Sequence, residues 1–287
     1  MPLPHSQSAV TQRVPPHAWF VVSAVFHYLG PSFAVMLFAH IAPLGVAWLR
    51  ITSAAIFFAI WRRPWRYFAK LTRQERWLVV SLGVVLAAMN ALFYLAINAL
   101  PLSTVGAIEF LGPIGLAAFG ARSVRNVAAL IVAGAGVYIL TDVRIAGAPL
   151  AYLYAFANCA LFVAYIVLGH RISGDSGIDR LGLSMLIAMV AALPLGIHAA
   201  LPAFSDFRLL AAAIGVGISS SVIPYVTDQL AMARLARATF ALLLSILPAT
   251  ATLIGFLVLA QIPTLPELAG IALVIVGIAL HRAKEAR

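Results

Sequence analysis

The chain has 287 residues, of which 63% are hydrophobic and only 10% are charged, and its mean hydropathy is +1.02. Soluble globular proteins carry about 25% charged residues, so this composition excludes that class and predicts an integral membrane protein. The net charge of +10 does not indicate nucleic-acid binding, because the basic residues form short clusters between apolar runs instead of a basic face.

The first segment, residues 1–17, contains four prolines and one basic residue. The apolar run that follows is longer than the 7–15 residues of a signal-peptide core, so we expect a retained first helix. We interpret residues 1–17 and 283–287 as two short cytoplasmic tails.

Ten apolar runs have the length needed to cross a bilayer. About 20 mainly apolar residues are required, because each backbone polar group in lipid must be satisfied within its own helix. The predicted spans are 18–39, 43–61, 77–99, 102–120, 124–141, 148–169, 181–201, 209–231, 236–260 and 264–281. The predicted fold is therefore all-α, with ten transmembrane helices.

Basic residues are distributed unevenly between the two sides of these spans. Sixteen of the 19 Lys and Arg residues fall in the terminal segments or in alternate connections, while the opposite connections hold only Arg144 and Arg208. Because basic loops stay in the cytoplasm, both termini are predicted to be cytoplasmic. The longest connection, 62–76, is basic and aromatic and is expected to lie against anionic lipid.

Two segments of the first half of the chain recur, in the same order, in the second half. The matched positions are Thr104 with Thr239, Pro113 with Pro248, and Gly136 with Gly277. This order predicts two five-helix repeats, 18–144 and 145–282. Because five is odd, the second repeat enters the membrane from the other side, and the binding site of such an inverted repeat is expected at the midplane between the halves.

The segment 83–119 (GVVLAAMNALFYLAINALPLSTVGAIEFLGPIGLAAF) resembles the third and fourth helices of bacterial threonine/homoserine exporters. These belong to the EamA branch of the drug/metabolite transporter superfamily. Segments 42–66 and 223–249 continue the resemblance, which covers most of the chain. It implies ten helices, a bacterial inner-membrane location and proton-linked export of small metabolites such as amino acids.

The chain departs from the family pattern at two places. Leu247 stands where relatives often carry an acidic residue, and Ala260 with Gln261 stands where Gly-Glu is frequent. These departures bear on the substrate and the coupling ion and not on the fold.

Three formal charges lie clearly within predicted helices: Arg50, Glu109 and Asp228. Ionisable side chains there are costly and usually mark a pathway or a pair. Arg50 and Glu109 lie at the same depth, roughly 10–12 Å from the outer side, so they can be partners. Glu109 is then either the carrier of the coupling proton or the contact of a substrate ammonium, with Arg50 tuning it, or the pair is a permanent structural one. Asp228 is either an interfacial charge or a second proton or amine site.

A polar row on the third helix consists of Asn90, Tyr94 and Asn98 at steps of four residues. The repeat offset places Tyr225 opposite Asn90, and Ser221 extends that polar face on the eighth helix. These residues supply donors and acceptors for a zwitterion. The alternative is interhelical hydrogen bonds, each worth about 0.6 kcal/mol.

His27 and Asn158 are further candidates, each near the middle of an apolar run. His27 is able to titrate with a proton cycle, and Asn158 is a candidate for substrate binding, whereas packing is the alternative for both. Pro113 and Pro248 each remove a helical hydrogen bond and are predicted to form paired hinges, or else purely structural kinks.

Glycines of the fifth and tenth helices suit close helix packing, with a homodimer face as the second interpretation. They include Gly134, Gly136, Gly270 and Gly277.

No catalytic or cofactor motif is present in the sequence: it has no GxSxG, Walker loop, HExxH or cysteine pair. We therefore expect no enzyme activity, cofactor or metal. The predicted function is secondary active export of amino acids by alternating access and proton antiport, with the substrate, protons and membrane lipids as partners. The alternatives are an exporter of other organic solutes or drugs, an importer, and, from a different class, a membrane-embedded enzyme or a non-transporting membrane factor.

Overall fold

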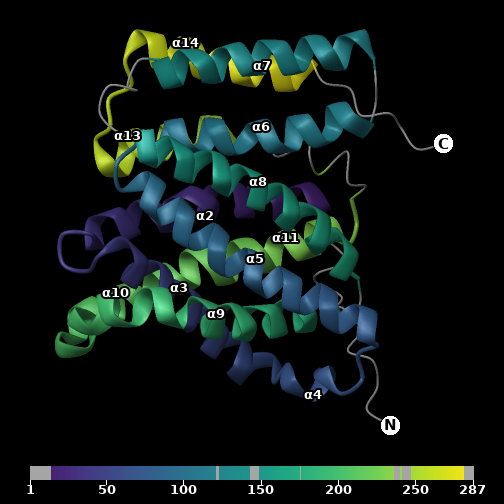
Figure 1. Ribbon diagram of the computed structural model, residues 1–287, viewed down its shortest axis with the longest axis vertical. Coiled ribbons are helices and arrows are strands. Elements are labelled where there is room, and N and C mark those ends of the chain that lie inside the picture. Colours follow the sequence, from purple (N-terminus) through teal and green to yellow (C-terminus); the bar gives the residue numbers. More distant parts are fainter. Residues whose placement is uncertain are drawn as a thin grey trace.

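A computed structural model describes residues 14–120, 123–142, 149–174, 176–235, 240 and 247–280. Within these ranges all regular structure is helical (Figure 1). The helices are α2 (Pro16–Leu37), α3 (Pro43–Arg62), α4 (Trp65–Phe68), α5 (Arg73–Ile97), α6 (Leu102–Gly120), α7 (Val124–Asp142), α8 (Pro149–Ile172), α9 (Gly177–Ser205), α10 (Phe207–Gly217), the π-helix η2 (Ile218–Val222), α11 (Ile223–Met232), α13 (Leu247–Leu259) and α14 (Leu265–Leu280).

Six segments of the described chain are long and apolar enough to cross a membrane. They are α2, α3, α5, α8, α9 and the continuous run Phe207–Met232, which joins α10, η2 and α11. Shorter apolar helices occur at Val127–Gly136, Leu247–Leu259 and Leu265–Gly277. The chain is therefore an all-helical multi-pass membrane protein.

The observed helices follow the predicted spans closely, with three differences. The 62–76 connection contains the short helix α4, and α5 begins earlier than predicted, at Arg73. The predicted span 209–231 is interrupted by the π-helix η2. Of the predicted span 236–260, the structure describes residue 240 and α13, while Thr239 and most of both predicted tails lie outside the described residues.

The helix ends follow local sequence signals. Pro16, Pro43 and Pro149 each begin a helix, where the missing N–H of proline is not needed. Thr72 and Glu75 form a capping box at the start of α5, in which each side chain satisfies a backbone N–H of the other residue.

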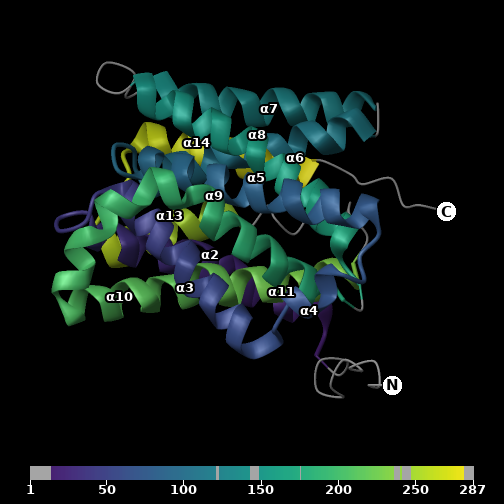
Figure 2. The same cartoon turned by 60° about the horizontal axis from the view of Figure 1, so that its bottom comes forward.

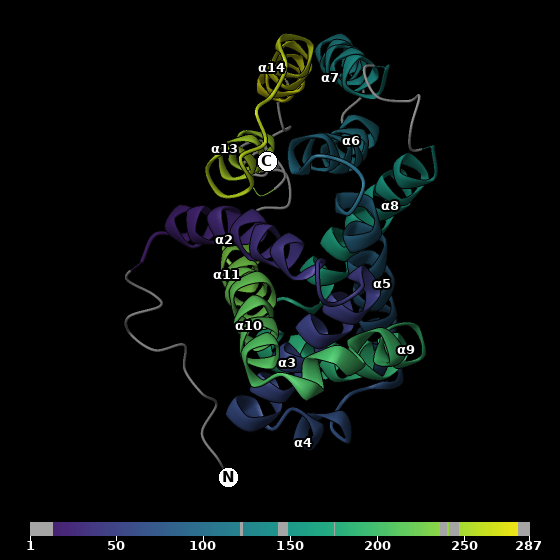
Figure 3. The same ribbon diagram turned by 90° about the vertical axis from the view of Figure 1, so that its left-hand side faces the viewer.

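The helices pack in pairs drawn from distant parts of the sequence. The most extensive contacts between helices are those of α3 with α9, α7 with α14, α5 with α8 and with α9, and α2 with α11. In Figure 3, α7 and α14 are seen nearly end-on, side by side at one end of the molecule. This packing places segments of the two halves against each other throughout the described chain.

Glycine permits the close contact between α7 and α14. A Cβ atom on Gly136 would lie 2.5 Å from the carbonyl oxygen of Gly270, and one on Gly277 would lie 2.7 Å from that of Ala129. A Cβ on Gly134 would meet nothing within 4 Å. The predicted packing role is therefore confirmed for Gly136 and Gly277 within the chain. Gly134 makes no such contact within the chain, and a homodimer face there stays a prediction.

Candidate functional site

A small cavity, here called the central cavity, lies among α2, α3, α5, α6, α8 and α11. Its lining residues are His27, Arg50, Met89, Asn90, Phe93, Glu109, Asn158 and Tyr225. Its volume is ≈10 Å³, which is room for about one water molecule. Six of its eight lining residues are polar or charged, and all six are among the nine polar or charged site candidates predicted from the sequence.

Glu109 accepts hydrogen bonds from two other helices. The Tyr28 hydroxyl donates to Oε2 at 3.1 Å, and the Asn158 amide Nδ2 donates to Oε1 at 2.9 Å. The Nε2 atom of His27 lies 3.7 Å from Oε2. Since Glu109 is only 2% exposed, these neutral or titratable groups are its solvation shell.

Arg50 is buried and is held by the polar face of the eighth predicted span. Its Nε donates to Ser221 Oγ at 2.7 Å, and its Nη2 donates to the carbonyl oxygen of Ser220. The guanidinium carbon lies 5.4 Å from the ring centre of Tyr94 and 6.0 Å from that of Tyr225. These cation–π contacts stabilise the charge within an apolar surrounding.

The expected direct contact between Arg50 and Glu109 is not formed. Both residues line the central cavity, but the guanidinium is bonded to η2 and the carboxylate to Tyr28 and Asn158. Equal depth in the membrane does not fix the direction in which two side chains point, and for this reason the sequence could not exclude the pair.

The interruption of the helix at η2 explains why Arg50 is needed there. Pro224 has no N–H, so it cannot donate to the carbonyl of Ser220 four residues earlier, as an α-helix requires. The guanidinium of Arg50 supplies a donor to that carbonyl. In Figure 2, α10 and α11 follow one another along one edge of the molecule, on the two sides of this π-helix. Single π-helical turns are frequent at functional sites.

Asp228 was predicted to be either an interfacial charge or a second proton or amine site, and its burial disagrees with the first interpretation. It is 3% exposed and accepts hydrogen bonds from Ser23 Oγ at 2.5 Å and from the Tyr165 hydroxyl at 2.9 Å. His27, one turn after Ser23 on α2, interacts electrostatically with its carboxylate. Glu109 on α6 is the carboxylate that His27 contacts, at 3.7 Å.

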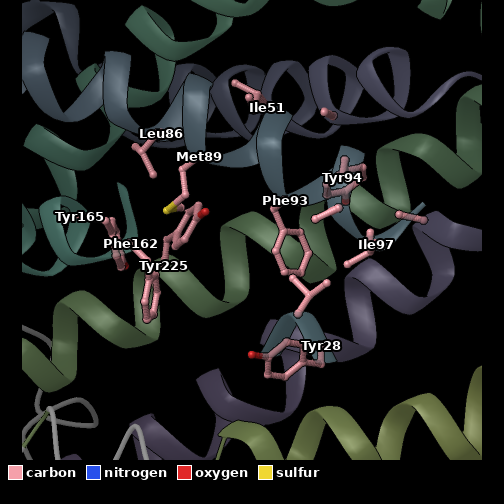
Figure 4. Close-up of a cluster of buried hydrophobic side chains, with 14 of the residues drawn as sticks. Tyr28, Ile51, Leu86, Met89, Phe93, Tyr94, Ile97, Phe162, Tyr165 and Tyr225 are labelled. Carbon is pink, nitrogen blue, oxygen red and sulfur yellow. The ribbon is translucent and has the colours of Figure 1, made fainter. Parts of the chain in front are cut away.

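Aromatic rings pack among the polar side chains of the site. Figure 4 shows Phe162, Tyr165 and Tyr225 close to Met89, with Phe93 and Tyr94 further along the same helix as Met89. The rings of Tyr165 and Tyr225 lie 5.4 Å apart, and those of His27 and Phe162 lie 5.8 Å apart.

The predicted polar row on α5 is divided between two cavities. Asn90 donates to the Leu86 carbonyl at 2.7 Å and to the Tyr225 hydroxyl at 3.4 Å, so the predicted proximity of Asn90 and Tyr225 is a direct contact. Tyr94 is buried beneath Arg50. Asn98 lies at the helix end, in a larger cavity of ≈400 Å³ between the α5–α6 and α13–α14 connections.

Four contact residues were missed from the sequence: Ser23, Tyr28, Tyr165 and Ser220. Ser23 lies four residues before His27, so the helical period alone places both on one face of α2. Ser220 acts through its carbonyl, and no side-chain pattern indicates that role. Among the described residues, no group of three His, Cys, Asp or Glu side chains is arranged to hold a metal ion.

The two predicted hinge prolines occupy different surroundings. Pro113 lies inside the continuous helix α6 and is buried, while Pro248 is the second residue of α13. Residues 241–246 before it are outside the described part of the chain, so the paired hinges stay a prediction.

Residues 149–282 match the EamA-like transporter family. This part of the chain is therefore similar to members of that family. Threonine/homoserine exporter RhtA of Escherichia coli (strain K12) is 29% identical over 253 residues, which are 86% of this chain and 84% of that protein. RhtA of Salmonella typhimurium (strain SL1344) is 29% identical over 239 residues, covering 81% and 79%.

A solved crystal structure also resembles this chain. The TM-score is 0.58 at 17% identity, over 92% of this chain and 96% of the other. At this identity the likeness concerns the fold. The sequence-based resemblance to EamA-type transporters is confirmed, and the family match and the relatives indicate a membrane transporter.

Proposed function

We propose that this chain is a secondary active transporter that exports amino acids or related small metabolites by alternating access and proton antiport. The observation that carries the proposal is the buried Glu109 carboxylate in the central cavity, with hydrogen-bond donors from α2 and α8 around it. The printed names of the relatives, threonine/homoserine exporter, suggest the substrate class.

Helix packing supports the proposed ten-helix inverted repeat with halves 18–144 and 145–282. In this repeat α2, α3, α5, α6 and α7 are equivalent to α8, α9, the run α10–η2–α11, α13 and α14, in that order. When each helix is replaced by its equivalent, the α5–α8 contact becomes α11–α2, and the α6–α8 contact becomes α13–α2. Both members of each pair are present. The contacts α3–α9, α6–α13 and α7–α14 map onto themselves, as a twofold axis requires.

A single buried carboxylate is sufficient to couple protons to an amine. An ionised carboxylate in an apolar surrounding is costly, so Glu109 holds either a proton or a cationic group of the substrate, but not both. A proton arriving from outside then favours release of the substrate, and its departure to the cytoplasm permits rebinding. This exclusion is sufficient for antiport.

His27 and Asp228 extend the proposed proton route. His27 lies 3.7 Å from the Glu109 carboxylate, and Ser23, one turn earlier on α2, donates a hydrogen bond to Asp228. We assign Asp228 as a second carboxylate on this route, held by Ser23 and Tyr165.

The central cavity has no room for an amino acid in this conformation, so substrate entry requires the surrounding helices to separate. Pro113 and Pro248 are the proposed hinges of that motion. Both termini are proposed to be cytoplasmic in a bacterial inner membrane, since the basic residues gather in the connections on that side.

The test is transport by the purified protein in liposomes with an imposed pH gradient, using labelled threonine and homoserine and then a wider set of amino acids. We expect the pH gradient to drive the labelled amino acid in the export direction. For protein inserted with its cytoplasmic face outward, this movement is measured as uptake into the liposomes. Flux of another solute class without flux of any amino acid would refute the substrate proposal.

Substitution of Glu109 tests the coupling. Glu109→Gln should abolish gradient-driven flux, because the amide neither binds a proton nor carries the charge that holds the substrate ammonium. Glu75→Gln is the matched control, since glutamine also forms a capping box at the start of α5. Full gradient-driven flux by Glu109→Gln would remove Glu109 from the mechanism.

A further inference from the structure

The central cavity presents opposite charges from different helices without a salt bridge between them. Arg50 on α3 and Glu109 on α6 both line it, and the hydrogen bonds of each are to neutral groups, with His27 at 3.7 Å from Glu109. Two buried charges that line one space without neutralising each other leave complementary charge for a ligand.

The Arg50 side of the cavity is a set of donors. A guanidinium has five N–H groups in a planar fork, and the hydrogen bonds to Ser221 and Ser220 use the Nε and Nη2 nitrogens. The Asn90 amide and the Tyr225 hydroxyl line the same cavity. A carboxylate is the anion that such a fork binds bidentately.

The Glu109 side of the cavity is a set of acceptors. Both carboxylate oxygens of Glu109 are present, and Asn158 adds its Oδ1 atom, which is fully buried and has no hydrogen-bond partner in the structure. A buried acceptor left without a donor costs about 1–3 kcal/mol, so its presence beside a carboxylate indicates a ligand that donates. An ammonium group has three such donors and no acceptor.

We propose that the central cavity recognises a zwitterion, with the substrate carboxylate on Arg50 and the substrate ammonium on Glu109 and the Oδ1 atom of Asn158. This inference rests on the proposed function and adds its specificity: the substrate is an α-amino acid with both charged groups free. Met89 and Phe93 are the apolar lining residues and contact the rest of the substrate.

Binding at Arg50 also connects the substrate to the π-helix. The Nε and Nη2 atoms that donate to Ser221 and Ser220 together form one of the two bidentate faces of the guanidinium, so a substrate carboxylate on this face competes with both bonds to η2. Occupation of the cavity thereby weakens a contact between α3 and η2, which lies between α10 and α11. The zwitterion is in this way a ligand that acts on the interrupted helix.

The first experiment varies the ligand and leaves the protein unchanged. Liposomes containing the protein and labelled threonine are challenged with unlabelled threonine, with its amide, with its methyl ester and with the 2-hydroxy acid that lacks the amine. We expect the amide, the ester and the hydroxy acid each to compete at least about 10-fold more weakly than threonine. Equal competition by the amide would overturn the proposal. If no amino acid is carried at all, the proposed function itself fails.

The second experiment varies the two sides of the cavity. Arg50→Gln should remove the preference for threonine over its amide, and Asn158→Leu should remove the preference for threonine over the hydroxy acid, a change in ratio that a purely structural role does not produce. Thr52→Val is the control, since it removes another buried hydroxyl without a partner, two residues from Arg50. If Arg50→Gln does not fold, the ligand series and Asn158→Leu still decide; unchanged ratios in the variants that fold would overturn the proposal.

Discussion

Ala260 holds a backbone conformation that residues with a side chain rarely adopt. Its φ is 51° at the end of α13, where the N–H of Gln261 donates to the carbonyl of Gly255 at 3.1 Å. Helices commonly end with a left-handed residue, and glycine is preferred there because it has no Cβ. This preference explains why glycine is frequent in the family at this position, where this chain has Ala260 instead.

Ala260→Gly is therefore expected to stabilise the protein by about 0.5–1 kcal/mol, as the relief of left-handed strain exceeds the entropy cost of glycine in the unfolded chain. Thermal unfolding of the purified protein in detergent measures this. Ala272→Gly, at an exposed helical position of α14, is the control and should cost about 1 kcal/mol. A loss of stability at both positions would show that Ala260 is not strained.

The candidate site illustrates what a sequence reveals at the scale of single residues. Arg50, Asn90, Glu109, Asn158 and Tyr225 were predicted because polar groups within apolar runs are costly and therefore informative. Their hydrogen-bond partners were not predictable in the same way. The contact between Arg50 and Ser221 joins positions 171 residues apart, and no local spacing encodes it.

At the scale of helices, Arg50, η2 and Pro224 form one unit. The proline removes a donor, the helix widens into a π-turn, and the guanidinium supplies a donor to the Ser220 carbonyl. Apolar periodicity predicts that a helix is present, but it does not detect a one-residue widening, and so the predicted span 209–231 had no interruption.

This unit predicts coupling between Arg50 and Pro224. Arg50→Gln alone should cost about 1–3 kcal/mol, because the Ser220 carbonyl and Ser221 hydroxyl lose their partner. In a Pro224→Ala background the backbone N–H of residue 224 is available, so the same substitution should cost at least about 0.5 kcal/mol less. The free energies of unfolding of the unchanged protein, the two single variants and the double variant give the coupling energy. If the costs of the two substitutions are strictly additive, the predicted coupling is contradicted.

The contact between α7 and α14 gives a second prediction at this scale. Gly136→Ala places a Cβ against the Gly270 carbonyl, a backbone atom that cannot rotate away, so the helices must separate at a cost of about 1–3 kcal/mol. Gly134→Ala, two residues earlier on α7, meets nothing within 4 Å and should stabilise by about 0.5–1 kcal/mol. Unfolding midpoints in detergent compare the two; equal stability would mean that α7 and α14 do not pack so closely.

At the scale of the whole molecule, the lipid surroundings determine how much of the fold is predictable. Because every span must be apolar and helical, composition and run length were enough to place the described helices within a few residues. Helix order in space was harder, since it depends on which faces carry the small and polar residues that meet between helices. The inverted repeat was inferred from weak self-similarity, and the paired contacts of α2 and α8 with equivalent helices support it.

The proposed orientation makes a prediction for the intact membrane. Residues 62–76 carry six of the basic residues and should face the cytoplasm, whereas the connection between α9 and α10 should face outward. Lys70 is exposed within the first connection, and Ser205 is exposed at the end of α9, next to the second. With the one native cysteine removed by Cys159→Ala, a thiol reagent that does not cross membranes should label Ser205→Cys in intact cells and label Lys70→Cys only after the membrane is opened. Labelling of both positions in intact cells, or the reverse pattern, would invert or refute the topology, and with it the direction of export that the antiport proposal requires.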